Sequence, residues 1–170
     1  MNLLKDIPAG TVDEMNVIVE IRKGSHNKYE IDKQTGLIAL DRVYHTTQDT
    51  PFDYGFVPQT LWEDGDPLDV IILTTYPLDI GILVKVRPVG LMDMIDSGEG
   101  DAKIIAVPVS DPRWNDTKDL SDINKHILKE MEHYFTTYKM LQGKEVIIKG
   151  FENKESAKKA FEKAILAYKS

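Results

Sequence analysis

Residues 62–73 of the chain read Trp-Glu-Asp-Gly-Asp-Pro-Leu-Asp-Val-Ile-Ile-Leu, an acidic run that leads directly into an apolar run. The carboxylates of Asp64, Asp66 and Asp69 fall within six positions. Carboxylates this close repel one another and are costly to desolvate unless a cation lies between them. The apolar residues 70–73 have the pattern of a buried strand, so the acidic cluster is joined to the core. The stretch therefore indicates hard divalent cations and phosphate chemistry.

The length and composition around this stretch predict one globular domain spanning residues 1–170. The sequence contains no cysteine, which excludes disulfides and thiolate metal sites and leaves oxygen or imidazole ligands. The formal net charge of −7 opposes binding to a nucleic-acid backbone, so we expect no nucleic-acid partner. The absence of an apolar span of membrane-crossing length and of a secretory signal predicts a soluble, cytoplasmic protein without a membrane partner.

Short β-type runs separated by Gly and Pro occupy the first two-thirds of the chain, at a spacing typical of a barrel or sandwich. We expect them at residues 16–21, 28–31, 37–40, 70–73, 82–89 and 104–109, with a turn at 32–36. Farther on, Ser121 is expected to cap a helix that runs to about residue 141 and stops at Gly143. After a strand at 145–149, Asn153 is expected to cap a second helix. Strands first and helices last predict an α+β, mainly β fold in which the helices pack against a β-barrel.

The acidic residues have simpler interpretations than a metal site. One is a solvated acidic turn, and another is an EF-hand loop, because Asp-x-Asp begins one. Counted from Asp64, however, the sixth position is Asp69 instead of Gly and the twelfth is Thr75 instead of Glu, which excludes the EF-hand. A second acidic group, Asp96 and Asp101, flanks a Gly-rich bend and alone would be an ordinary loop. The two groups together could supply oxygen ligands to several Mg²⁺ ions.

Motifs of several other enzyme classes are absent. The four histidines have no metal-ligand spacing, and neither a Gly-x-Ser-x-Gly nor a Walker-type Gly-Lys-Ser/Thr segment occurs. Two alternatives stay open at this point. One is an OB-type oligonucleotide-binding module, which the net charge of −7 disfavours. The other is a metal-dependent phosphohydrolase that acts on nucleotides.

The segment Asp64-Gly-Asp-Pro-Leu-Asp-Val70 resembles the signature of the family I soluble inorganic pyrophosphatases. Further matches follow in the family's order and with near-family spacing over roughly residues 8–165, and the compact length resembles the prokaryotic branch. They are Glu20, Lys28-Tyr-Glu30, Asp41-Arg42, Tyr54-Gly55, Arg87-Pro-Val-Gly90, Asp96, Glu99-x-Asp101-Ala-Lys103 and His133…Tyr138-Lys139. One departure is Arg22, where the family usually has proline; since Arg does not fix φ, we expect the loop leading to Lys28 to be more flexible.

The resemblance implies a five-stranded OB-like barrel with two main C-terminal helices packed against it. It also implies Mg²⁺-dependent hydrolysis of pyrophosphate to two orthophosphates, by in-line attack of a metal-activated hydroxide. The implied assembly is a homohexamer built as a dimer of trimers.

The same resemblance implies a role for each matching site residue. Several Mg²⁺ ions would be held by carboxylates, with Asp69 shared between two ions and Glu20 in the outer shell. Asp66 would be the general base that accepts a proton from the attacking water. The metal ligands would be Asp64, Asp69, Asp96, Asp101 and Glu30. The phosphate oxygens would be held by Lys28, Arg42, Tyr54, Lys103, Tyr138 and Lys139.

Overall fold

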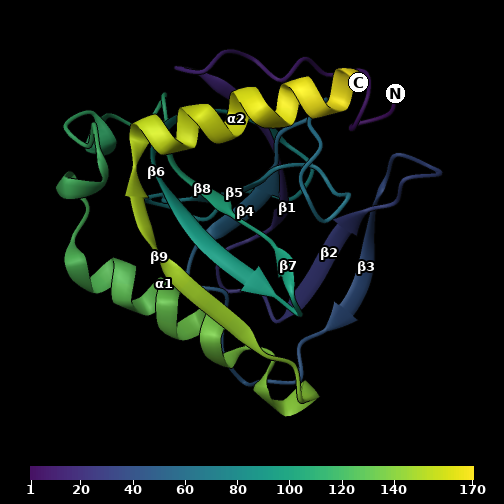
Figure 1. Ribbon diagram of the computed structural model, residues 1–170, viewed down its shortest axis with the longest axis vertical. Helices are drawn as coiled ribbons and strands as arrows, with labels where there is room; N and C mark the ends of the chain where they lie inside the picture. The colour runs from purple at the N-terminus through teal and green to yellow at the C-terminus, as the bar shows by residue number, and fades with distance from the viewer.

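Five strands close into an uneven ring in the computed structural model, which describes residues 1–170 (Figure 1). All neighbouring strands of the ring are antiparallel except β5 and β8, which run parallel. The ring closes where β6 pairs back onto β1. The order around it is β1 (Met15–Ile21), β4 (Asp53–Phe56), β5 (Asp69–Ile72), β8 (Lys103–Pro108) and β6 (Leu83–Asp96).

The remaining elements surround this ring. Strands β7 (Glu99–Gly100) and β9 (Val146–Asn153) pair with β6, whereas β2 (Asn27–Ile31) and β3 (Ile38–Val43) form a separate hairpin beside the ring (Figure 1). The two helices are α1 (Lys125–Thr137) and α2 (Lys154–Lys169), and short 3₁₀ helices span Pro112–Trp114, Leu120–Asp122 and Met140–Gln142. The predicted α+β, mainly β fold, with a closed five-stranded sheet and two C-terminal helices, is confirmed. Neither helix combines the length and the apolar character needed to span a membrane.

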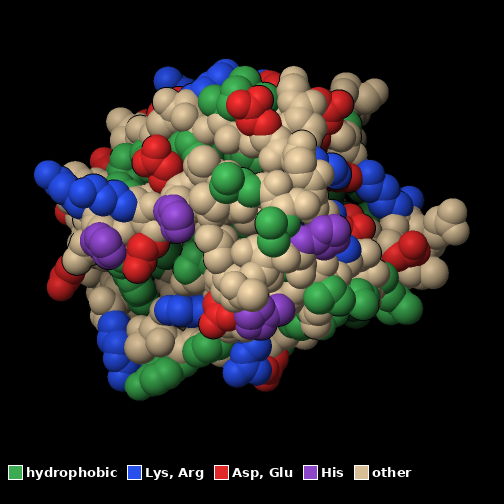
Figure 2. Space-filling model, turned by 90° about the horizontal axis from the view of Figure 1, so that it is seen from below, with side chains coloured by type: hydrophobic (Ala, Val, Ile, Leu, Met, Phe, Trp, Pro, Cys, Tyr) green, Lys and Arg blue, Asp and Glu red, His purple; other side chains and the backbone are tan.

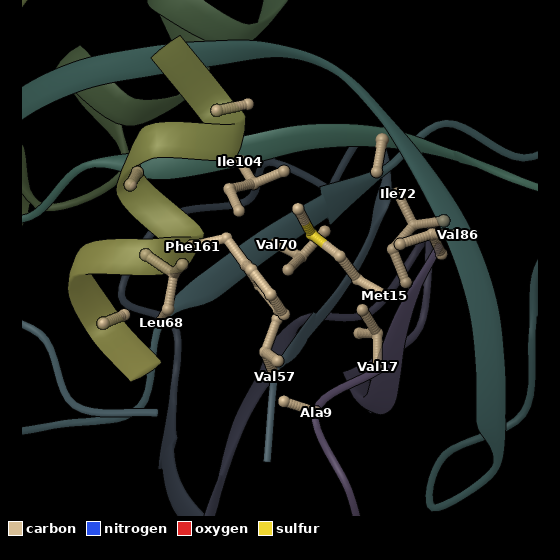
Figure 3. Close-up of a cluster of buried hydrophobic side chains, with 14 of the residues drawn as sticks. Ala9, Met15, Val17, Val57, Leu68, Val70, Ile72, Val86, Ile104 and Phe161 are labelled. Carbon is tan, nitrogen blue, oxygen red and sulfur yellow. The ribbon is translucent and has the colours of Figure 1, made fainter. Parts of the chain in front are cut away.

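Strand β5 of the ring is buried on both faces, because α2 packs on one side of it and α1 on the other. In β5, Val70 and Ile72 join a cluster that includes Phe161 of α2, as Figure 3 shows. Ile71 lies between them in sequence and joins a second cluster with Phe135 of α1. Side chains alternate between the two faces of a strand, so a strand covered on both sides must be apolar at every position. This explains the unbroken apolar run that follows the acidic cluster.

Strand β4 has no clear sequence signal. Gly55 allows it to pack closely against β1. Strands β1 and β4 approach closely, and a Cβ on Gly55 would lie 2.0 Å from the carbonyl oxygen of Ile18. Only glycine can occupy this position without moving β1. The preceding residue, Tyr54, is thereby fixed next to the ring, and the hydroxyl of its buried side chain reaches Asp69.

The helix boundaries correct one prediction and confirm another. Helix α1 begins at Lys125, and its cap is Asn124 instead of the expected Ser121, which lies in a 3₁₀ turn capped by Asp119. It ends at Thr137, before the expected residue 141, although Gly143 does end the following 3₁₀ turn with φ +66°. Helix α2 is capped by Asn153 as predicted. Ser121 is wrong as a cap because the capping box of Asp119 and Asp122 already holds this segment in a 3₁₀ turn.

Arg22, which stands in place of the family's usual proline, has a partner in the structure. Its guanidinium Nη1 lies 2.9 Å from Oδ1 of Asp79, and both side chains are largely exposed. The ion pair connects the loop after β1 to the loop after β5, although an exposed pair of this kind adds little stability.

Candidate active site

The ring, the β2–β3 hairpin and two loops enclose a cavity of about 720 Å³, lined mainly by charged side chains. All but one of the site residues predicted from the sequence line it, although they come from distant parts of the chain. The exception is Arg42, which is absent from the cavity wall. The predicted residues that line it are Glu20, Lys28, Glu30, Tyr54, Asp64, Asp66, Asp69, Asp96, Asp101, Lys103, Tyr138 and Lys139.

A buried lysine organises the ring side of the cavity. The Nζ atom of Lys103 lies 2.8 Å from the hydroxyl oxygen of Tyr54, 2.8 Å from Oδ2 of Asp69 and 2.9 Å from Oδ1 of Asp101. The Tyr54 hydroxyl in turn donates to Asp69 at 2.5 Å. The backbone dictates this arrangement, because Asp69 and Lys103 are direct partners in the parallel β5–β8 register. Asp101 lies two residues before Lys103 in the chain, which brings its carboxylate within reach of the same ammonium.

Burial and mutual repulsion make the acidic groups hard to ionise. Burial, opposed in part by Lys103, raises the pKa of Asp101 to about 6, and Asp69 adds to the rise. Burial also raises the pKa of Asp64, and it raises that of Glu20 well above the usual range. In each case the charge of Asp69 acts in the same direction. Additional positive charge would favour the ionised form of these carboxyl groups. The set of oxygen donors therefore fits hard divalent cations.

Cations of the protein pair with these carboxylates in the structure. Lys103 pairs with Asp69 and Asp101, and Lys139 pairs with Asp96. No three histidine or acidic side chains converge tightly enough to hold a metal ion. Metal coordination by the predicted set would therefore require some of these side chains to rotate away from their lysine partners.

Tyr138 and Lys139 directly follow the C-terminal end of helix α1. Tyr138 is buried, and its ring stacks on that of Tyr134 at 5.1 Å between centroids. Burial raises the pKa of the Tyr138 hydroxyl and lowers the pKa of Lys139. Burial works against ionisation of Asp96, but the hydrogen bond and charge of Lys139, together with smaller effects of Ser97 and Lys103, outweigh it, and the pKa of Asp96 is lowered. The Asp96 carboxylate is therefore ionised against the Lys139 ammonium at the cavity wall.

The β2–β3 hairpin supplies the opposite wall. Lys28 and Glu30 form an ion pair on one face of β2, and Asp41 lies 3.9 Å from the Lys28 ammonium. Arg42 pairs with its neighbour Asp41 at 2.6 Å, whereas its Nε and Nη2 atoms are buried without a hydrogen-bond partner. Two unpaired donors on one guanidinium are unusual, because buried polar groups are normally satisfied. Arg42 therefore retains hydrogen-bonding capacity close to the cavity.

Several cavity residues were given no role by the sequence analysis. Asp41 and Glu99 were noted only as matches to the family, whereas Lys33 and Ser97 had no signal. Lys33 lies in the turn of the hairpin, where a lysine is normally solvated; its Nζ atom lies 2.6 Å from Asp66. Ser97 and Glu99 lie in the Gly-rich bend between the two acidic residues of the second group. Their positions follow from tertiary contacts that no local pattern encodes.

Charges of both signs are mixed on one face of the molecule. Figure 2 shows basic and acidic side chains interspersed over one face of the molecule, with no continuous basic stripe there.

Known proteins resemble this chain over nearly its whole length. A family model described as inorganic pyrophosphatase matches residues 17–169. Proteins named inorganic pyrophosphatase from Helicobacter pylori and Haloferax volcanii are each 46% identical over 171 residues; both alignments cover 99% of this chain, with 99% and 97% of the respective relatives. The crystal structure of inorganic pyrophosphatase from Thermus thermophilus matches with a TM-score of 0.96 at 42% identity, and the match covers 100% of both chains.

Proposed function

Because the chain belongs to the inorganic pyrophosphatase family and is a pyrophosphate-hydrolysing enzyme, we propose that residues 1–170 form one catalytic domain that cleaves pyrophosphate in a Mg²⁺-dependent reaction. The observation that carries the proposal is the composition of the cavity. Carboxylates from two loops line a single space together with cations from the ring, the hairpin and the end of α1. A dense polyanion needs positive charge on several sides, and here metal ions would supply what the acidic protein lacks.

The carboxylates Asp64, Asp69, Asp96, Asp101 and Glu30 would hold the Mg²⁺ ions, with Glu20 behind them. When bound, these ions supply positive charge against the phosphates and lower the pKa of a coordinated water. Glu20 is well suited to a supporting role, because its Oε1 atom accepts the backbone N–H of Ile31 at 2.9 Å and so holds the end of β2 next to the hairpin turn.

Asp66 is the proposed general base. Its backbone N–H donates to Oδ1 of Asp64 at 3.0 Å, which orients the turn. Its own carboxylate is half exposed and free of any carboxylate partner, with Lys33 as its ion-pair partner. The residue can therefore accept a proton from the attacking water while its neighbours Asp64 and Asp69 hold metal.

The cationic and hydroxyl groups hold the two phosphates. Lys103 and Tyr54 project from the ring and Lys28 from the hairpin, whereas Tyr138 and Lys139 follow the end of α1. Arg42 lies outside the cavity wall, so its unpaired donors would have to turn toward the cavity to reach a phosphate. Donors fixed by burial stabilise the charge that develops on the leaving phosphate without having to reorganise during the reaction.

The decisive experiment measures phosphate release from pyrophosphate by purified protein, with excess Mg²⁺ and with chelator. We expect turnover with Mg²⁺ and none with chelator, and much slower release from ATP. In Asp66→Asn, kcat should fall by about 10²-fold or more, the usual effect of losing a general base, while the fold is retained. Asp13→Asn is the matched control, because Asp13 is exposed and pairs with Lys158 away from the cavity. Wild-type kcat in Asp66→Asn would eliminate Asp66 as the base.

We also propose that the enzyme is a homohexamer, a dimer of trimers, in the cytoplasm. Apolar side chains that a monomer would leave in water support an assembly: Met140, Leu141 and Ile147 are 63%, 74% and 49% exposed. Light scattering should give a particle six times the chain mass of 19.3 kDa. A particle of one chain mass would contradict the proposal.

A further inference from the structure

Lys33 lines the cavity but has no role in the proposed reaction. Its ammonium lies 2.6 Å from Oδ1 of Asp66 and 3.2 Å from the carbonyl oxygen of Gly65. Asp66 is the proposed general base, and its carboxylate makes no other hydrogen bond or ion pair in the structure. Lys33 is therefore the one polar group that restrains the side chain of the base.

The turn that carries Lys33 is fixed without help from this lysine. Ile31, which directly precedes the turn, is buried, and its N–H donates to Oε1 of Glu20 at 2.9 Å. Within the turn, Oδ1 of Asp32 accepts the backbone N–H of Thr35 at 2.6 Å. Lys33 thus reaches Asp66 from a firmly held support.

The backbone of the acidic loop, residues 62–66, is also fixed. Helix α2 holds the loop from behind, because the N–H of Leu61 donates to the carbonyl oxygen of Ala164 at 3.0 Å. Inside the loop, the carbonyl oxygen of Asp66 accepts the N–H of Trp62 at 2.7 Å, and the N–H of Asp66 donates to Oδ1 of Asp64 at 3.0 Å. The freedom that remains at this position is rotation of the Asp66 side chain, which is 52% exposed.

Neighbouring charges favour rotation of that side chain toward solvent. Burial raises the pKa of Asp64, and the charges of Asp69 and Asp66 add to the rise, so these carboxylates repel that of Asp64. Lys33 offsets the repulsion on the cavity side. The hydrogen bond to Asp66 raises the pKa of Lys33, and the charges of Asp66, Asp64 and Glu30 act in the same direction. Without the ammonium, the carboxylate of Asp66 would be repelled by its neighbours and free to turn out of the cavity.

We propose that Lys33 is a positioning residue for the general base, because its ammonium holds Oδ1 of Asp66 and keeps the carboxylate turned into the cavity. The ammonium approaches Oδ1, which leaves Oδ2 to accept the proton of the attacking water. The inference rests on the proposed function, since it requires Asp66 to be the base. Both side chains are more than half exposed, and an exposed ion pair is worth up to about a fivefold change in an equilibrium.

Crystal structures without metal or substrate test the positioning itself. The variants are Lys33→Met, Lys33→Arg and a matched control, Lys85→Met; Lys85 is 63% exposed and pairs with Glu14 at 2.9 Å, outside the cavity. In Lys33→Met, the odds of the cavity-facing Asp66 conformer against all other conformers should fall about two- to fivefold, with the backbone of residues 62–66 in place. Lys33→Arg should retain this conformer because it keeps the charge, and Lys85→Met should match wild type.

Kinetics separate an effect on the base from an effect on phosphate binding. In Lys33→Met, kcat for pyrophosphate should fall about two- to fivefold at unchanged KM, because a general base acts only in the transition state. When Asp66→Asn is already present, adding Lys33→Met should lower kcat no further, because the group that Lys33 positions is gone.

An unchanged Asp66 conformer in Lys33→Met would overturn the proposal. A raised KM at constant kcat, or an equal fall in kcat with and without the Asp66 carboxylate, would also overturn it, since either result would make Lys33 a ligand of the phosphates. If the wild-type protein fails to hydrolyse pyrophosphate, or Asp66→Asn keeps the wild-type kcat, the proposed function or the role of the base fails. The crystal structures still decide in that case whether Lys33 positions Asp66.

Discussion

The charges at the ring side of the cavity depend on one residue, Lys103. Its side chain is 3% exposed, and its ammonium contacts Tyr54, Asp69 and Asp101 within 2.9 Å. The three acceptors are buried or nearly so, and two of them are carboxylates whose repulsion Lys103 offsets. A buried ion pair contributes little net stability, but removing one partner leaves an uncompensated buried charge.

We predict that Lys103→Met lowers the free energy of unfolding in chelator by about 3 kcal/mol, the lower end of the cost of breaking a buried pair. Added Mg²⁺ should restore part of this loss, because a divalent cation can take the place of the ammonium between the carboxylates. Denaturant unfolding with and without Mg²⁺ measures both effects. Lys149→Met, which removes an exposed lysine at 4.0 Å from Asp93, is the control. Equal stability of wild type and Lys103→Met in chelator would contradict this account.

Asp64, Asp66 and Asp69 are neighbours in the chain, so the sequence alone showed that their carboxylates lie close together. Twelve of the thirteen residues implied by the family resemblance line the cavity. Lys33 could not be predicted, since its partners lie in the acidic loop more than thirty residues away and only the closed hairpin brings them together. The pairing of Lys139 with Asp96, 43 residues away in the chain, was equally invisible to local reasoning.

Among the elements, helix α2 has the best-supported start. Asn153 accepts the N–H groups of Glu155 and Ser156, and Asp119 accepts the N–H of Lys154 from the neighbouring 3₁₀ turn. Two side chains thus satisfy three of the four N–H groups that a helix start leaves open. This double capping fixes the first turn of α2, the helix that holds the acidic loop from behind.

The charge of Asp119 should appear in the pH dependence of stability. The hydrogen bonds from the N–H groups of Lys154 and Leu120 lower the pKa of Asp119 below its ordinary value of 3.8. The ionised form therefore stabilises the fold fully above that ordinary value, and this contribution is lost as the pH falls through the lower folded value. We predict that wild type is more stable than Asp119→Asn at pH 6, and that the difference shrinks below about pH 4. Chemical denaturation at several pH values measures it.

Asp116→Asn is the matched control for this titration, because Asp116 lies in the same connecting segment and accepts no side-chain hydrogen bond. It should show no comparable pH-dependent difference from wild type. A difference between wild type and Asp119→Asn that stays constant from pH 6 to pH 3 would contradict a contribution from the charge.

Helices and strands were predicted correctly where the residues inside them carried a clear pattern. Asn153 followed by an apolar face predicted α2 correctly, and the alternating or apolar runs located most strands within a few residues. The start of α1 was wrong because Ser121 and Asn124 are both good caps, and only the competing capping box decides between them. Strand β4 was missed because its four residues are recognisable only by their pairing with β1 and β5.

For the molecule as a whole, metal binding is expected to stabilise the folded state, because the cavity holds carboxylates that repel one another and have raised pKa values. Any ligand that binds only the folded state adds RT ln(1 + [L]/Kd), or about 2.7 kcal/mol at one hundred times Kd. For a protein of this size, each kcal/mol raises the melting temperature by about 2–4 °C. The binding of Mg²⁺ should therefore raise it by about 5–11 °C.

Thermal unfolding in MgCl₂ and in NaCl of the same ionic strength tests this expectation. The NaCl series controls for general screening of the −7 net charge. Asp69→Asn, which removes the carboxylate proposed to be shared between two ions, should lose most of the Mg²⁺-specific rise. Identical melting temperatures in the two salts would show that the cavity does not bind Mg²⁺ under those conditions.

The parallel pairing of β5 with β8 also sets an order of events during synthesis. Asp69 and Lys103 are register partners but lie 34 residues apart in the chain. At about 5–20 residues per second, the ribosome adds Lys103 about 2–7 seconds after Asp69. Throughout that interval the nascent chain carries its acidic cluster without the lysine that neutralises it, so water must solvate the carboxylates. The ring side of the cavity is therefore begun early in translation and completed only once β8, the last ring strand in the chain, has been made and has docked.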